Sequence, residues 1–367
     1  MKAMTLFRPV VCALAAAACA SAGNTSDTGA PQPASQQTTS PAVRWPVKTR
    51  EHVDLWLHGY ALLQEDTTLV PFFRRGYRDQ MVVLKNRANV VTQLDANRDK
   101  LRARLLANPA LINAQFVPLG FTSWDEMSRA VNVFLQAEGD PQRAATRETA
   151  MQIASLAAYF QTQADRDWLR LFMQSLSDEQ NRFYHSYWTE QQRERGNVVA
   201  VVDSIWQKIY RPKMQSFLSN SGQANGEVLL SLPLDGEGRT QSDGKLQNTI
   251  TVTFPDTPAQ AVDAIYVIAH EAVGKLASQS VIDNTTPNDQ RNGVADKYMS
   301  AAAVRGGAML LQRVAPELLN GYARYYLTSA HRSVGSDVQA SLAAAFPLPD
   351  AIRDAIGRQL DVVIGGI

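Results

Sequence analysis

The sequence predicts a mainly helical protein with a small β-sheet, of the α+β class. From residue 46 to about residue 225, apolar residues recur at intervals of three and four, which is the period of a helix that buries one face. The period changes to alternation at residues 249–254, where Ile250 and Val252 share one side of a strand and three threonines share the other. A helical period then returns. We therefore expect a helical domain at 46–225 and a mixed domain at 226–367.

The start of the chain indicates export. Lys2 and Arg8 form a basic segment, and the apolar run at 10–18 is too short to span a bilayer, as in a secretory signal. We predict a signal peptide at 1–19. The following residues, 20–45, are rich in Ser, Thr, Gln, Ala and Pro, so they cannot bury a core and are expected to form a disordered tether.

Two interpretations of leader cleavage remain open. Residues 20–22 read Ala-Ser-Ala, a signal-peptidase site that would release a protein starting at Gly23. Residues 16–19 resemble a bacterial lipobox, in which Cys19 would carry a lipid anchor. The lipobox is favoured because Cys12 and Cys19 are the only cysteines, and both lie in the leader. We expect a periplasmic or membrane-anchored lipoprotein, or alternatively a secreted protein.

Composition excludes two classes of function. The chain has 36 Lys and Arg against 35 Asp and Glu, so it lacks the basic excess that binds nucleic acid. No second apolar run is long enough to span a membrane, and we expect no transmembrane helix in the mature chain. The roughly 320 residues after the tether suffice for one large domain or two ordinary ones.

The N-terminal helices are predicted from apolar periodicity and from caps. Ser123 followed by Glu126 is a capping box that begins one of them. The others are expected at 51–64, 78–106, 146–160, 165–195 and 198–218. The helix at 165–195 carries an aromatic stripe, which is more often core than a ligand groove.

The C-terminal part begins with a second alternating segment at 227–234. A Gly-rich connection at 235–244 separates it from the strand at 249–254, and we interpret its Gly-x-Gly as a hairpin loop because no helix follows directly. Pro258 then begins a long helix at 259–278. Four further helices are expected, at 289–314, 316–329, 336–345 and 349–363.

The long helix carries the most informative residues of the chain, His270, Glu271 and Gly274. In an H-E-x-x-H helix, two histidines one turn apart hold zinc and the glutamate acts as general base. Here Gly274 stands where the second histidine would be, and it has no side chain to bind a metal.

The order of strand, His-Glu helix and later helices resembles the catalytic unit of zincin metallopeptidases, especially the gluzincin type, over residues 226–367. The resemblance implies that His270 is the first zinc ligand and Glu271 the general base. It implies a third ligand from a later helix, for which Glu317 or Asp296 is the candidate. Zinc is the one cofactor that the resemblance implies, but these ligands are too few for a tight tetrahedral site, so the sequence favours no bound cofactor.

The resemblance also implies a peptide-binding cleft lined by His270, Gly274, Ile250 and Val252. Because only four residues join strand to helix, we expect the two elements to pack together. The helix face with His270 would then point at the aromatic helix 165–195, and Gly274 would allow a close approach.

Three functions remain open. The hypothesis that takes both the resemblance and the missing ligand at face value is a catalytically degenerate envelope protein that binds a peptide or another envelope protein. The first alternative is an active zinc metallopeptidase with a non-standard ligand set, in which His185 or His331 approaches His270. The second is an unrelated helical envelope lipoprotein whose His-Glu pair is accidental. Whether the chain is an enzyme is not decided by its sequence.

Overall fold

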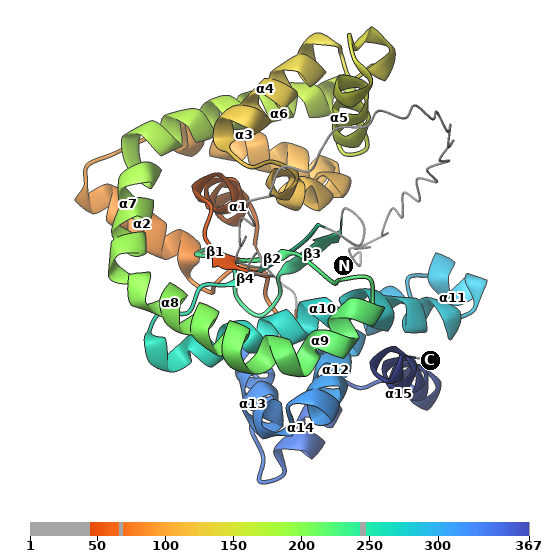
Figure 1. Cartoon of the computed structure of the whole chain (residues 1–367). Coiled ribbons are helices and arrows are strands. Elements are labelled where there is room, and N and C mark those ends of the chain that lie inside the picture. The colour runs from red at the N-terminus through yellow and green to blue at the C-terminus, as the bar shows by residue number, and fades with distance from the viewer. Residues whose placement is uncertain (1–44, 66–68, 243–246, 367) are drawn as a thin grey trace, which may run out of the picture.

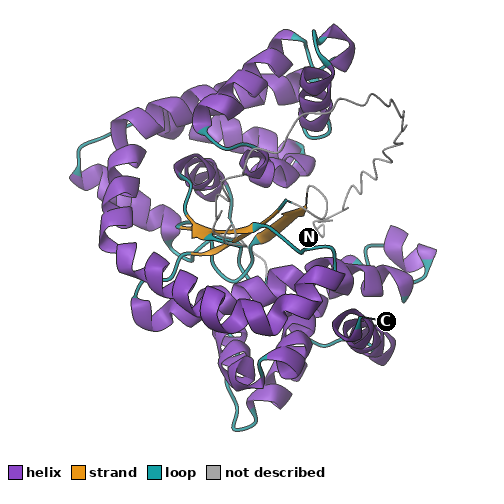
Figure 2. Ribbon diagram, viewed as in Figure 1, coloured by secondary structure: helices purple, strands orange, loops and turns teal. Residues whose placement is uncertain are grey.

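The protein is mainly helical with one small sheet, as predicted (Figure 1, Figure 2). The structure, a computed structural model, describes residues 45–65, 69–242 and 247–366. The predicted signal peptide, Cys19 and nearly all of the predicted tether lie outside the described residues. None of the helices within these ranges combines the length and apolar character that a membrane span requires.

The N-terminal helices follow the predicted order, with one correction. The helix expected at 78–106 is two helices, because Asn89 adopts a left-handed φ of 51° and Thr92 begins a new helix with a capping box to Asp95. The elements of this part are α1 (Glu51–Leu63), α2 (Tyr77–Arg87), α3 (Gln93–Ala107), the 3-10 segments η1 (Pro109–Gly120) and η2 (Pro141–Arg143), α4 (Trp124–Gln136) and α5 (Arg147–Ala157).

Two long helices each contain a π-helical turn. The first consists of α6 (Gln163–Glu179), the turn Gln180–Tyr184 and α7 (His185–Glu194). The second consists of α8 (Gly196–Ile205), the turn Trp206–Tyr210 and α9 (Arg211–Asn220). In the second, Pro212 follows the turn and has no N–H to continue the regular hydrogen-bond ladder.

The sheet has the order β1-β2-β4-β3, formed by β1 (Val47–Lys48), β2 (Glu227–Ser231), β4 (Asn248–Thr253) and β3 (Arg239–Ser242). β2 pairs in parallel with β4, with Val228 opposite Ile250, so the prediction of a hairpin loop between these two strands is wrong. A parallel pair needs a crossing connection. That connection contains β3, which pairs antiparallel with β4 and escaped sequence analysis because its side chains are polar.

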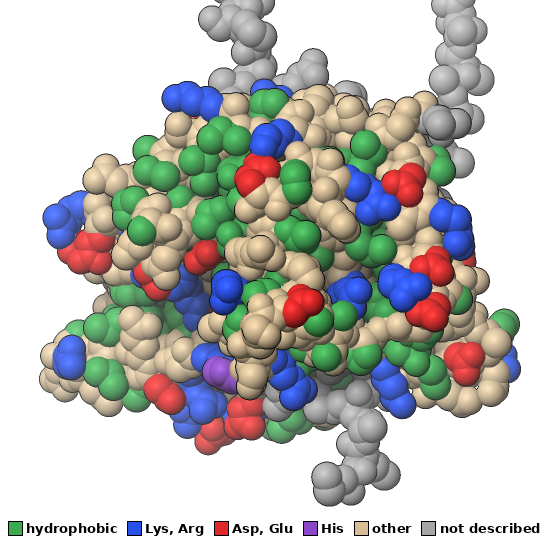
Figure 3. Space-filling view, turned by 90° about the horizontal axis from the view of Figure 1, so that it is seen from below, with side chains coloured by type: hydrophobic (Ala, Val, Ile, Leu, Met, Phe, Trp, Pro, Cys, Tyr) green, Lys and Arg blue, Asp and Glu red, His purple; other side chains and the backbone are tan. Residues whose placement is uncertain are grey.

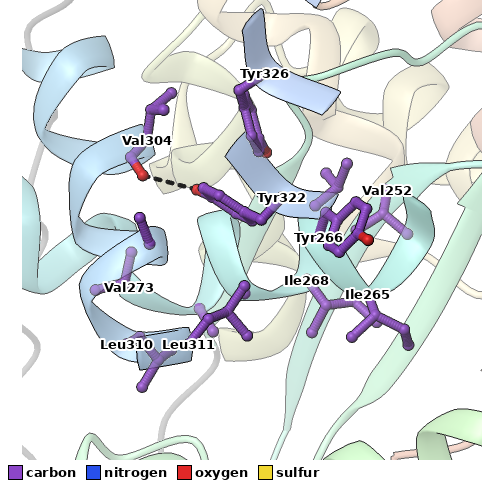
Figure 4. Packing of buried hydrophobic residues seen from close by; sticks show 14 of the residues in the cluster. Val252, Ile265, Tyr266, Ile268, Val273, Val304, Leu310, Leu311, Tyr322 and Tyr326 are labelled. Carbon is purple, nitrogen blue, oxygen red and sulfur yellow. Dashed lines mark hydrogen bonds between the residues drawn. The ribbon is translucent and has the colours of Figure 1, made fainter. Parts of the chain in front are cut away.

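The helix α10 (Ala261–Asp283) follows β4 and packs against it, as the short connection predicted. Figure 4 shows Ile265 and Ile268 of α10 near Val252 of β4. Every residue from 264 to 270 is buried, so this first half of α10 has no solvent-facing side, whereas Lys275 and Gln279 in the second half are exposed. The remaining elements are η5 (Pro258–Gln260), α11 (Pro287–Arg291), α12 (Asp296–Val314), η6 (Pro316–Leu318), α13 (Leu319–Ser329), α14 (Val338–Ala345) and α15 (Asp350–Gly365).

The buried apolar residues form two clusters. One joins α1 to the helices from α2 to α6, and most of the predicted aromatic stripe, including Trp168 and Phe172, lies inside it. The other surrounds the sheet and α10, and it includes Val202 and Phe217 of α8 and α9, which precede residue 226 in sequence. On the face of the molecule in Figure 3, basic and acidic side chains are interspersed, in keeping with a formal net charge of +1.

Candidate functional site

His270 lies in the middle of α10 and is only 5% exposed. Its ring stacks on Tyr326 of α13, with ring centroids 5.3 Å apart and an interplanar angle of 20°. Gly307 of α12 lies against it, since a Cβ added there would be 3.3 Å from the His270 Cα and 2.2 Å from the Tyr322 hydroxyl. The C-terminal helices α12 and α13 therefore enclose His270. The expectation that this face points at the aromatic helix 165–195 is wrong, because α12 and α13 occupy that side.

Glu271 connects α10 to the segment that leads from β2 to β3. Its Oε1 lies 2.9 Å from Nδ1 of His270 and accepts a hydrogen bond from the backbone N–H of Gly238 at 3.0 Å. Its backbone carbonyl accepts from the Thr240 hydroxyl at 3.0 Å. Only glycine fits at position 238, because a Cβ there would be 1.9 Å from the carbonyl oxygen of Thr251.

The β2–β3 connection is held by two further helices. The Tyr326 hydroxyl of α13 donates to the Gly236 carbonyl at 3.0 Å, and the Ser300 hydroxyl of α12 donates to Glu237 at 3.0 Å. The connection around Glu237 is thus fixed between α10, α12 and α13. The Gly-x-Gly at 236–238 was visible in the sequence, but nothing local indicated its partners.

Burial and the neighbouring acidic residues have opposite effects on the pKa of His270. Burial lowers the pKa of His270, but the hydrogen bond and charge of Glu271, with the charge of Glu237, outweigh burial and leave that pKa raised. Nε2 of His270 is buried and has no hydrogen-bond partner among the described residues. The imidazole is therefore oriented by Glu271 through one nitrogen and enclosed at the other.

Gly274 lies one helical turn after His270 and is half-buried. A Cβ added to it would meet no atom within 4 Å. The expectation that Gly274 permits a close approach of another element is therefore wrong. Its lack of a side chain leaves open space where the resemblance implies a second zinc ligand.

The other proposed metal ligands do not converge on His270. Glu317 forms an ion pair with Lys213 at the surface. Asp296 begins α12, eleven residues before Gly307, which is roughly 16 Å along the helix axis. His185 lies 3.0 Å from Glu51 of α1, and His331 is exposed beyond the end of α13.

Among the described residues the candidate ligands do not form a metal-binding group, and the two candidate cleft residues of β4 are buried. Zinc sites use three or four converging His, Cys, Asp or Glu ligands, and in the described parts of the chain no three such side chains form a metal-binding group. The side chains of Ile250 and Val252 on β4 are fully buried and belong to the apolar cluster around α10, so they do not line a groove. The predicted site residues His270 and Glu271 are adjacent in the chain and hydrogen-bonded to each other.

Comparison of the chain with protein-family models, curated proteins and solved structures finds no match.

Proposed function

We propose that this is an exported cell-envelope protein that uses a metallopeptidase-like fold as a non-catalytic scaffold for a peptide or another protein. The observation that carries the proposal is the position of the Glu271 carboxylate. A general base in such a fold would take a proton from a metal-bound water. Here Oε1 of Glu271 is bound to the Gly238 N–H and to His270, so the carboxylate fastens the β2–β3 connection to α10.

The arrangement of strands and helix supports the resemblance to zincins. Parallel strands β2 and β4 carry an antiparallel strand β3 at the sheet edge, and the helix with His270 follows β4 directly and packs against it. Gly274 stands where a zincin has its second zinc ligand, and the missing ligand supports a non-catalytic role for the fold.

The edge strand β3 supports peptide binding. Described residues form no strand on its outer side, and Gln241 is exposed. An open strand edge presents backbone N–H and C=O groups that an extended peptide can pair with. Because Thr240 of β3 also bonds to Glu271, a peptide added there would lie next to the His270–Glu271 pair.

Export is proposed from the leader, where Lys2, Arg8 and the apolar run precede Cys19. Mass spectrometry of the mature N-terminus tests it. A lipidated Cys19 is expected; an unmodified start at Gly23 would leave export intact and remove the anchor.

Binding and catalysis are tested on the same preparation. Peptides selected from a linear phage library are compared with copies N-methylated at alternate residues, which cannot pair with a strand edge; we expect the copies to lose binding. Casein hydrolysis and zinc content are measured for the wild type and for Glu271→Gln. We expect neither protein to cleave casein above the buffer rate. Stoichiometric zinc with hydrolysis that Glu271→Gln abolishes would establish the metallopeptidase instead, and equal binding of the N-methylated copies would remove the strand-edge mode.

A further inference from the structure

The side chains of β3 alternate between the two faces of the sheet. The Thr240 hydroxyl donates to the backbone carbonyl of Glu271, so Thr240 lies on the face that α10 covers. Arg239 and Gln241, on either side of Thr240 in the strand, therefore lie on the opposite face. In Figure 1 the sheet lies between α10 and the N-terminal helices, so this opposite face meets the N-terminal part of the chain.

Two contacts place these side chains against η1. The Arg239 guanidinium lies over the Phe116 ring, with Cζ 5.6 Å from the ring centroid. The amide nitrogen of Gln241 would lie 3.7 Å from a Cβ added at Gly120. Phe116 is itself buried, and its ring centroid lies 6.0 Å from that of Phe72. The segment η1 thus provides a packed aromatic surface that positions a cation beside the edge strand of the sheet.

No acidic residue in the described ranges forms an ion pair with Arg239, although the residue is half-buried. The carboxylates of nearby elements bind other groups. Glu227 of β2 pairs with Arg50, and Glu126 of α4 accepts from the Thr122 backbone N–H at 2.7 Å. A half-buried guanidinium loses part of its hydration, and a carboxylate replaces that hydration best because it accepts two parallel N–H bonds. Arg239 therefore offers a place for a carboxylate from outside the chain.

The open edge of β3 determines which ligand can reach this guanidinium. An extended peptide paired with that edge places its side chains alternately on the two faces of the sheet. A peptide residue opposite Arg239 lies on the same face, with the two Cβ atoms about 4.5–5.5 Å apart. A glutamate or aspartate there comes within reach of the guanidinium. Gln241 is a diagonal neighbour of the same peptide residue, and its amide can donate to the same carboxylate.

We propose that the β3 edge selects peptides that carry an acidic side chain, and that Arg239 is the residue that recognises this side chain. The inference rests on the proposed strand-edge binding and adds the charge of the ligand. Backbone pairing holds the peptide, whereas the ion pair beside the Phe116 ring selects its sequence. A formal net charge of +1 gives the chain no general attraction for acidic ligands, so the selection comes from this position.

The test compares two hexapeptides, Thr-Val-Glu-Val-Thr-Val and Thr-Val-Gln-Val-Thr-Val, each with an N-terminal fluorescein and a C-terminal amide. Fluorescence anisotropy measures their binding to the whole chain. We expect the glutamate peptide to bind about tenfold more tightly, and the difference to shrink when sodium chloride is added.

Variants of the arginine assign this preference to one residue. Arg239→Gln should abolish the difference and leave the affinity for the glutamine peptide unchanged, because backbone pairing is intact. Arg239→Lys should retain part of the difference, since it keeps the charge and loses the two parallel N–H bonds. Arg358→Gln removes an exposed arginine of α15 with the same change in net charge, and it should keep the full difference. Circular dichroism establishes that each variant is folded.

The outcomes separate this inference from the strand-edge binding on which it rests. Equal binding of the two peptides by the wild type, with loss of binding on N-methylation at alternate residues, retains the strand edge and overturns the acidic preference. Failure of both peptides to bind removes strand-edge binding and the inference with it. A tenfold difference that persists in folded Arg239→Gln shows that another cation recognises the carboxylate, and it overturns the role of Arg239.

Discussion

The carboxylate of Glu271 and the backbone N–H of Gly238, 33 residues apart in sequence, form a hydrogen bond of 3.0 Å. This bond fastens the β2–β3 connection to α10. The same carboxylate oxygen lies 2.9 Å from Nδ1 of His270. One oxygen thus satisfies a backbone donor that would otherwise be unpaired and also fixes the orientation of the buried imidazole. The His270-Glu271 dipeptide, which resembles a catalytic motif, therefore links α10 to the β2–β3 connection.

Glu271→Gln should change the free energy of unfolding by less than about 1 kcal/mol, because an amide oxygen can still accept from Gly238. Glu271→Ala should cost about 1–3 kcal/mol, because the Gly238 N–H loses its partner. Urea unfolding of both variants measures the difference. Equal losses in the two variants would show that the hydrogen bond to Gly238 contributes nothing.

The sequence could predict the elements and one of their contacts. The helix start at Ser123 is encoded locally by its cap, because the Ser123 hydroxyl accepts from the Glu126 backbone N–H. The second half of the predicted capping box is wrong, because the Glu126 carboxylate accepts from the backbone N–H of Thr122 instead of that of Ser123. The packing of β4 on α10 followed from a short connection. The sheet topology could not be predicted, since the parallel pairing of β2 with β4 depends on tertiary contacts and β3 has no apolar alternation.

The sequence also could not predict which residues surround His270 in the fold. A helical wheel assigns one apolar face to α10, but the sheet, α12 and α13 cover it on several sides. Gly238 lies 33 residues before its partner Glu271, and Tyr326 lies 56 residues after its partner His270. Only the folded chain brings these positions together.

Two glycines on neighbouring helices should respond oppositely to alanine. Gly274→Ala should raise the free energy of unfolding by about 0.5–1 kcal/mol, because alanine favours the helix and the added Cβ meets open space. Gly307→Ala should lower it by about 1–3 kcal/mol, because the Cβ would meet the Tyr322 hydroxyl at 2.2 Å. Thermal and urea unfolding of the pair measure both effects. A loss of stability in Gly274→Ala would mean that another element does approach this position.

Gly274→His tests whether the helix retains the geometry of a zinc site. Residues 270 and 274 are one turn apart on α10, and position 274 has room for a side chain, so the variant presents two histidines on one helix side. We expect zinc affinity to increase at least about tenfold over the wild type, measured by calorimetry and by metal content after gel filtration. Gly274→Ala is the control for helix stability without a ligand. Unchanged zinc affinity would show that Nε2 of His270 stays enclosed when a second ligand is supplied.

Asp54 should make stability depend on pH. The residue lies on α1 and is 1% exposed, and its Oδ2 accepts a hydrogen bond from the Trp188 indole N–H at 3.0 Å. Burial raises the pKa of Asp54 from 3.8 to about 7, against the opposing effects of hydrogen bonds from Ser231, Trp188 and the Leu232 backbone. Between these values the folded state binds more protons than the unfolded state, so the contribution of Asp54 to stability falls as pH rises through this window.

Asp54→Asn should remove this dependence, because an amide oxygen still accepts from Trp188 and carries no charge to desolvate. The difference in pKa corresponds to at most about 4 kcal/mol, so the variant should be more stable than the wild type at pH 8 by up to that amount, with the gap closing toward pH 4. Urea unfolding from pH 4 to pH 8 measures both profiles. Glu51 is on the same helix but is paired with His185 near the surface, so Glu51→Gln is the matched control. This variant should keep the wild-type loss of stability between pH 4 and pH 8. Parallel wild-type and Asp54→Asn profiles would mean that the folded protein ionises Asp54 without cost, which the burial of this carboxylate argues against.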